Sequence, residues 1–192
     1  MAQMGSTRIV GPIVEVAADH LVILNPDDKS KVTVKPDADA RIVKDRVFGA
    51  KLSELKAGDY AMVGGEMKDG ALQAKFIASS TEQSQTLRQN LGKTMVAGKV
   101  VAVDPDSASM KVRRVDGEDQ TLQFDENSSF KRMVRGGGES ITMADIKPGD
   151  GFSAKGAAKN GSFAVTEFTL MPRGGMMFGG AGRGSRPQQE QQ

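Results

Sequence analysis

Two stretches of the chain carry the same landmarks in the same order. Gly11 corresponds to Gly98, 87 residues later, and the turn at residues 55–59 corresponds to residues 146–150, 91 residues later. Hydrophobic residues are spaced similarly between these landmarks in both stretches. The offset grows by four, so the second copy has four extra residues near its middle. This internal repeat predicts two copies of one small domain.

The repeat divides the chain into four parts. We predict a first barrel at 7–78, a linker at 79–93 with room for a short polar helix, a second barrel at 94–171 and a flexible Gly/Arg/Gln-rich tail at 172–192. In the linker, Ser or Thr can cap a helix, Leu87 and Leu91 lie one turn apart, and Gly92 can end it.

Each copy has the pattern of a strand-rich domain. Val outnumbers Leu by 17 to 9, and β-branched residues favour strands. Alternating hydrophobic runs separated by turn residues predict five strands per copy. The expected strands are 9–16, 20–24, 31–34, 60–63 and 72–76 in the first copy, and 98–103, 109–115, 120–124, 151–155 and 163–169 in the second. The stretches between the third and fourth strands, 36–58 and 126–149, are less regular, although the first has room for one helical turn at residues 52–55.

This arrangement predicts an all-β chain of two tandem small five- to six-stranded OB-like β-barrels. Five strands with a long connection after the third follow the order of an OB-fold, and an SH3-like or other small barrel is the main alternative. Before the fourth strand of each copy we expect a structural turn formed by Gly58 and Asp59 in the first copy and by Gly149 and Asp150 in the second. Lys147-Pro148-Gly149-Asp150 fits a type II turn, with Pro at its second position and Gly at its third.

These turns carry a family resemblance. Leu55-Lys56-Ala57-Gly58-Asp59 leads into a strand that runs to Gly64, and Ile146-Lys147-Pro148-Gly149-Asp150 leads to Gly156. Both copies resemble the bacterial family called domain of unknown function 5666. The resemblance implies a small β-barrel in an exported bacterial protein, periplasmic or extracellular, whose signal peptide is absent from this sequence. A cytoplasmic location stays open, and the resemblance implies no catalytic residues.

The composition excludes several classes of site. The chain has no Cys and a single His, so it offers no thiolate site and no multi-histidine metal site. No run of about 18 apolar residues predicts a transmembrane helix. No nucleophile lies beside a base in a local motif, and no glycine-rich loop joins a strand to a helix. We therefore expect a protein that is not an enzyme, with no catalytic residues, no cofactor and no metal site.

Basic residues recur in the long connection of each copy. An OB-like barrel binds ligands on its second and third strands and the nearby loops, so these residues are tentative ligand contacts. The alternative is a solvated loop whose charge is offset by Asp37, Asp39 and Asp45. The candidates are Arg41, Lys44 and Arg46 in the first copy and Lys131, Arg132 and Arg135 in the second, with Lys44 aligned to Arg132.

We expect a binding or assembly module of the bacterial cell envelope or exterior. Its partner could be a protein, a polysaccharide or another copy of itself. An OB-type nucleic-acid or polyanion binder is the first alternative, although residues 1–171 carry no net charge. Base stacking needs aromatic rings on the ligand face, and core packing is the better account of six phenylalanines that fall at apolar positions of the strand patterns: Phe76, Phe124, Phe130, Phe152, Phe163 and Phe168.

A periplasmic copper-binding protein is the second alternative. Thioethers suit Cu(I), and Met171, Met176 and Met177 lie close together in the sequence. The other methionines, such as Met62 and Met110, are expected to fill cores that have few leucines.

Overall fold

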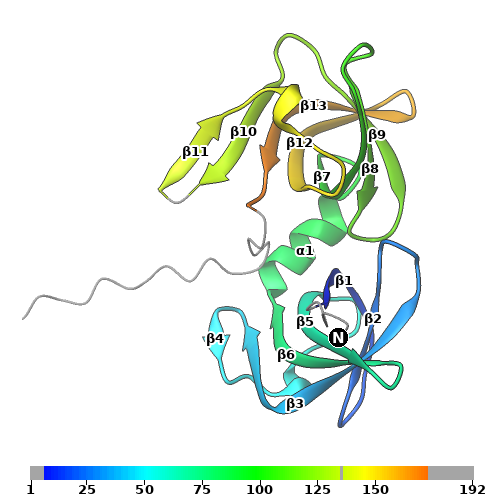
Figure 1. Ribbon diagram of the computed structural model, residues 1–192, viewed down its shortest axis with the longest axis vertical. Helices are drawn as coiled ribbons and strands as arrows, with labels where there is room; N and C mark the ends of the chain where they lie inside the picture. Colours follow the sequence, from blue (N-terminus) through cyan, green and yellow to red (C-terminus); the bar gives the residue numbers. More distant parts are fainter. Residues whose placement is uncertain (1–6, 135, 173–192) are drawn as a thin grey trace, which may run out of the picture.

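The computed structural model describes residues 7–134 and 136–172, and both copies of the repeat form closed five-stranded barrels (Figure 1). The expected class, all-β with two tandem OB-like barrels, is confirmed. Within the described residues, no helix is long and apolar enough to cross a membrane. We predicted a flexible tail at 172–192, and its residues from 173 onward lie outside the described part of the chain.

The first barrel closes through a parallel pair of strands. Strand β1 pairs with β2 and β5, β2 pairs with β3, and β6 joins β5 to β3. The β3–β6 contact is parallel and the others are antiparallel, which is a Greek-key path. The strands of the barrel are β1 (Thr7–Val16), β2 (Leu21–Leu24), β3 (Lys31–Lys44), β5 (Tyr60–Lys68) and β6 (Ala71–Ser79), with the short strand β4 (Val47–Phe48) and the 3₁₀ turn η1 (Leu52–Glu54) between β3 and β5.

The second barrel repeats this path strand by strand. Its parallel closure joins β13 to β9, and β10 also runs parallel to β13. Its strands are β7 (Met95–Asp104), β8 (Ser109–Arg114), β9 (Asp119–Gln123), β12 (Gly151–Lys159) and β13 (Ser162–Leu170), with β10 (Ser129–Val134), β11 (Gly137–Ser140) and the 3₁₀ turn η2 (Met143–Asp145) between β9 and β12.

The two stretches that the sequence left irregular form β-ribbons. In the first copy β3 continues past a register shift between Pro36 and Arg41 and then pairs with β4. In the second, β10 pairs with β11. We call residues 41–48 ribbon 1 and residues 129–140 ribbon 2. Most described side chains of both ribbons are exposed, although Ile42, Val43 and Phe130 pack against hydrophobic clusters. Apolar residues come in adjacent pairs, such as Val47-Phe48 and Met133-Val134, so no regular alternation of apolar and polar residues marks these segments as strands.

The extra residues of the second copy lengthen its ribbon. Lys44 pairs with Val47 across a turn of two residues, whereas Arg132 pairs with Glu139 with six residues between them. Lys44 lies beside Ser79 of β6, and Arg132 lies beside Leu170 of β13, 91 residues further along the chain. Lys44 and Arg132 therefore occupy equivalent places in the two barrels.

Each barrel has its own hydrophobic core. The first core is aliphatic and includes Ile13, Leu21, Ile23, Leu72 and Ile77. The second is built around phenylalanines, and the rings of Phe152 and Phe168 stack with their centroids 5.1 Å apart, as do those of Phe124 and Phe130 at 4.9 Å. These rings lie inside the second barrel or against its core and do not present a stacking face to solvent.

The repeated turn holds the first strand of each barrel at its bend. Gly58 and Gly149 have φ of +86° and +90°, a region in which a side chain is strained. The Gly149 N–H donates to Val100 O at 2.7 Å, and the Val100 N–H donates to Asp150 O at 2.9 Å. The strand pairing of β7 shifts register at the same place, between Val100 and Ala102. Two backbone hydrogen bonds thus join the loop before the fourth strand to the bulge of the first strand.

A helix and a third hydrophobic cluster join the barrels. Helix α1 (Thr81–Asn90) occupies the linker, and its Ser80 cap accepts a hydrogen bond from the Gln83 N–H at 3.3 Å. Helix α1 lies between the two barrels (Figure 1), and its Leu87 is buried against residues of both. This shared cluster consists of Tyr60, Met62 and Ala78 of the first barrel, Leu87 of the helix, and Ala97 and Val115 of the second barrel.

Candidate ligand groove between the barrels

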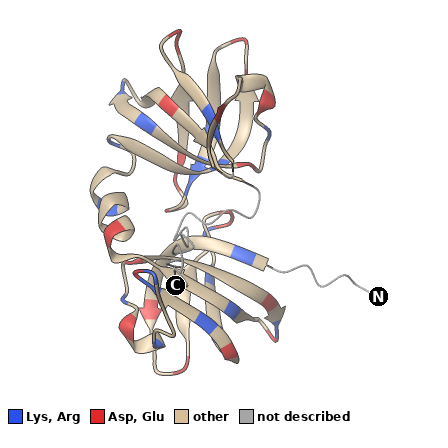
Figure 2. Ribbon diagram, turned by 90° about the vertical axis from the view of Figure 1, so that its left-hand side faces the viewer, with Lys and Arg blue, Asp and Glu red and all other residues tan. Residues whose placement is uncertain are grey.

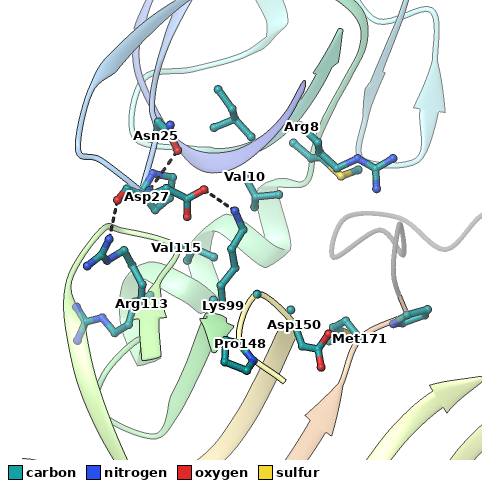
Figure 3. Close-up of a pocket in the computed structure, with 18 residues that line it drawn as sticks. Arg8, Val10, Asn25, Asp27, Lys99, Arg113, Val115, Pro148, Asp150 and Met171 are labelled. Atoms are coloured by element: carbon teal, nitrogen blue, oxygen red, sulfur yellow. Dashed lines mark hydrogen bonds and ion pairs between the residues drawn. The ribbon is translucent and has the colours of Figure 1, made fainter. Parts of the chain in front are cut away.

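A cavity of about 460 Å³ opens between the two barrels (Figure 3). Residues from both copies of the repeat line it, so neither barrel forms it alone. The lining consists of Arg8, Ile9, Val10, Asn25, Pro26, Asp27, Met62, Gly98, Lys99, Arg113, Arg114, Val115, Pro148, Gly149, Asp150, Gly151, Met171 and Pro172.

Much of the wall is apolar. Val10 comes from β1, Met62 from β5 and Val115 from the loop after β8, and Met62 and Val115 belong to the shared cluster. Pro148 of the repeated turn and Met171 after β13 lie on the opposite side of the opening (Figure 3). The shared cluster therefore continues into the floor of the groove.

The loop between β2 and β3 bridges the barrels at one side of the groove. The Lys99 ammonium lies 2.6 Å from an Asp27 carboxylate oxygen, and the Arg113 guanidinium donates to the Asp27 carbonyl at 2.6 Å (Figure 3). Arg113 also makes a two-pronged pair with Asp119, at 2.7 and 3.1 Å. This pair raises the pKa of Arg113 and lowers the pKa of Asp119.

Arg114 is fixed in a similar way. Its Nε and Nη2 donate to the two carboxylate oxygens of Asp116 at 2.9 and 2.5 Å. Both side chains are mostly buried, and the hydrogen bonds to Asp116 raise the pKa of Arg114. The guanidinium is therefore a fixed positive charge beside the groove.

Arg8 differs from the other cations of the lining. In the described part of the chain, its exposed guanidinium makes no ion pair or hydrogen bond, whereas the other three have acidic partners. Figure 3 shows Arg8 at the edge of the opening, on the side of Met171. A guanidinium without an acidic partner can bind a carboxylate, sulfonate or phosphate group.

The sequence-predicted ligand residues lie on the ribbons, away from this groove. Arg41 is exposed on β3, and Arg46 occupies the tight turn of ribbon 1 with φ +68°. Lys44 donates to the Glu54 carbonyl. Their role as ligand contacts stays a prediction.

In ribbon 2 the predicted cations have acidic neighbours. Lys131 pairs with Glu167 at 3.2 Å, and Arg132 lies 3.9 Å from Glu139. Arg135 lies outside the described residues. The structure therefore places one predicted cluster on each ribbon.

The repeated turns occupy two different surroundings. In the first copy, Arg88 of α1 donates to Gly58 O at 3.0 Å and lies 3.5 Å from the Asp59 carboxylate. In the second copy the turn at Gly149 lines the groove. No local motif predicts this difference, because it depends on how the two barrels dock.

The alternative sites have little support in the described residues. No three His, Asp or Glu side chains there gather into a metal cluster. Met171 lines the groove, while Met176 and Met177 lie outside the described part of the chain.

Comparison with known proteins identifies no family. No family model matches the chain, and no curated protein matches it. Among solved structures, the chain is similar to Drosophila Unr CSD456, with 16% identity and a TM-score of 0.27. That match covers 88% of this chain and 63% of the Drosophila chain, so this protein spans less than two thirds of its length. A similarity at this level does not indicate the function of this chain.

Proposed function

We propose that this protein is a non-enzymatic binding protein that holds a small amphipathic anion in the groove between its barrels. The observation that carries the proposal is the combination, in one cavity, of an apolar wall with the guanidinium of Arg8, which has no acidic partner among the residues that the structure describes. The apolar wall would hold the body of the ligand, and Arg8 would bind its carboxylate, sulfonate or phosphate group.

The dimensions of the groove support this ligand class. Small-molecule sites are mostly apolar concave spaces of about 300–1,000 Å³ with a few polar groups that fix orientation. The groove, at about 460 Å³, falls in this range. Its remaining cations, Lys99, Arg113 and Arg114, have acidic partners that hold them in place. The site is thus formed before a ligand arrives.

A nucleic-acid ligand has less support. The OB-like strand order agrees with such a function only at the level of fold. Base stacking needs exposed aromatic rings on the ligand-binding face, and the phenylalanines of the second barrel are in or against its core. Strands β2 and β3 of the first barrel carry no aromatic residue, and the exposed Phe48 lies on β4.

We include export and a role at the cell envelope in the proposal only because of the family resemblance. A groove that binds amphipathic anions suits a protein that meets lipids or peptide ends outside the cytoplasm. A copper site is not part of the proposal.

The proposal can be tested with 8-anilinonaphthalene-1-sulfonate, a fluorescent probe with an apolar body and one sulfonate. We expect saturable binding of one probe per chain. Replacing Arg8→Gln removes the charged partner of the sulfonate and should weaken binding about tenfold, as expected for a hydrogen bond to a charged group. Lys111→Gln is the control, because Lys111 is an exposed cation of β8 outside both the groove and the ribbons.

This control distinguishes binding in the groove from general electrostatic attraction of the anionic probe to the protein. Equal weakening by Arg8→Gln and Lys111→Gln, or no weakening by Arg8→Gln, would refute the proposed site. Far-ultraviolet circular dichroism of both variants checks that the barrels are intact.

A further inference from the structure

The two ribbons form a second surface that the groove does not use. Ribbons 1 and 2 come from equivalent places in the two barrels and lie on the same side of the molecule, at the left in Figure 1. Figure 2 views the molecule from that side and marks its charged residues. The first strand of each ribbon, β3 or β10, pairs with the last strand of its barrel, whereas the second strand, β4 or β11, pairs only within its ribbon.

Large apolar side chains are unusually exposed on these ribbons. Val47 and Phe48 of ribbon 1 are 63% and 68% exposed, and Met133 and Val134 of ribbon 2 are 45% and 44% exposed. These four are the majority of the strongly exposed large apolar residues in the described part of the chain. Exposed apolar side chains gathered in this way mark an interaction surface.

The pairing within ribbon 2 explains the exposure of its apolar residues. Met133 lies opposite Gly138, and Val134 lies opposite Gly137. Because glycine has no side chain, nothing on β11 covers either residue. The ribbon leaves two apolar side chains accessible instead of pairing them across the strands.

Positive charge is concentrated on the same segments. Ribbon 1 contains Arg41, Lys44, Arg46 and one acid, Asp45, and the described residues of ribbon 2 contain Lys131, Arg132 and one acid, Glu139. Ribbon 1 therefore has a net charge of +2 and the described part of ribbon 2 a net charge of +1, although residues 1–171 together sum to zero. The rest of that part of the chain is correspondingly acidic, so an anionic partner would be attracted to the ribbons and not to the barrels.

We propose that the two ribbons dock the protein onto an anionic membrane surface, with their apolar side chains in the headgroup region and their basic residues near the lipid phosphates. Charge alone would fit any polyanion. Exposed Phe48, Val47, Met133 and Val134 favour a lipid surface, because an interface of headgroups and acyl chains accepts apolar and cationic side chains together.

Co-sedimentation with vesicles tests this surface. We expect the full chain to bind vesicles of equimolar phosphatidylcholine and phosphatidylglycerol, and to bind pure phosphatidylcholine vesicles much more weakly. The double variant Phe48→Ser/Val134→Ser should reduce partitioning about tenfold, given the value of burying one large apolar side chain. Arg41→Gln/Arg132→Gln should reduce it by a similar factor, since each basic residue near an anionic surface contributes about 1 kcal/mol.

Two controls isolate the ribbons. Val101→Ser changes an apolar residue of similar exposure (46%) on β7, outside both ribbons, and should leave partitioning unchanged. Changing Arg173, Arg183 and Arg186 to Gln in the full chain should also leave most of the binding, because the ribbons carry it.

Three outcomes would overturn the inference. They are an absence of binding to phosphatidylglycerol vesicles, loss of binding in the variant with the three C-terminal arginines replaced, and binding that the Phe48→Ser/Val134→Ser change leaves intact. If the last outcome occurs together with tight binding to a thymidine oligonucleotide, the ribbons bind polyanions and not lipid. Since the groove is separate from the ribbons, failure here leaves the 8-anilinonaphthalene-1-sulfonate result unaffected.

Discussion

At the scale of single residues, backbone geometry at Gly149 explains why the repeated turn ends in Gly-Asp. Its φ of +90° lies in the region that disfavours any side chain, yet a Cβ placed there would meet no atom within 4 Å. The constraint is thus purely conformational. The sequence predicted this turn from Pro148-Gly149, because turn chemistry is local and needs no knowledge of the rest of the fold.

Gly149→Ala should therefore destabilise the protein by about 1–2 kcal/mol through backbone strain alone. Gly151→Ala is the matched control two residues away, where φ is not positive and the added Cβ makes only ordinary contacts at 3.9 and 4.0 Å. Urea denaturation followed by circular dichroism measures both. Equal stability of the two variants would show that the turn tolerates a side chain.

At the scale of elements, helix α1 is held by one buried serine. The Ser84 hydroxyl donates to Ser80 O at 2.7 Å and accepts the Tyr60 N–H at 2.9 Å. The helix is polar along most of its length and would be marginal in isolation. Packing against Tyr60, the first residue of β5, supplies the stability that the helix does not have by itself.

Ser84→Ala should cost about 1–3 kcal/mol, because it leaves the buried Tyr60 N–H without an acceptor. Alanine is the better helix former, so helix propensity alone predicts the opposite sign. Gln85→Ala, at an exposed position on the same helix, should change the free energy of unfolding by less than about 0.5 kcal/mol. If Ser84→Ala proves as stable as Gln85→Ala, the bond to Tyr60 contributes nothing.

The elements also show which parts of the fold a sequence can predict. Buried and less buried residues alternate along the barrel strands because one face of each strand points into the core. In β2, Leu21 and Ile23 are fully buried, while Val22 and Leu24 are only partly buried. The ribbons have only a few partly buried side chains and carry apolar residues in adjacent pairs, such as Val47-Phe48. Asp37-Ala38-Asp39-Ala40 consists of residues that disfavour strands, although β3 runs through it. Prediction failed where tertiary pairing, and not hydrophobic patterning, sets the structure.

At the scale of the whole molecule, the docking of the barrels creates the groove. The shared cluster includes Tyr60 of the first barrel, Leu87 of α1 and Ala97 of the second barrel. Two of its other members, Met62 and Val115, also line the cavity. Asp27 of one barrel contacts Lys99 and Arg113 of the other. None of these contacts lies within one copy of the repeat, which is why the sequence predicted the barrels but not the site between them.

Tyr60 makes the docking measurable because it is the only tyrosine in a chain without tryptophan. It is 6% exposed, and burial, followed by the nearby Asp116 carboxylate, raises the pKa of its phenol above the usual 10. Below pH 10 the phenol is neutral in both folded and unfolded chains. Above that pH the unfolded chain releases the proton first, so the stability contributed by Tyr60 should fall as pH rises above about 10.

The most direct test of the docked arrangement is the ultraviolet titration of Tyr60 in the full chain and in Ala97→Gln. Ala97 is fully buried in the shared cluster and outside the second barrel's own core, so a neutral, bulky Gln there should separate the barrels without opening either. Ala102→Gln, on the exposed part of the same strand, is the control. We expect a raised Tyr60 pKa in the unaltered chain and in Ala102→Gln, and a return to about 10 in Ala97→Gln. An equally raised pKa in folded Ala97→Gln would contradict the account, because Tyr60 would then be buried without the second barrel.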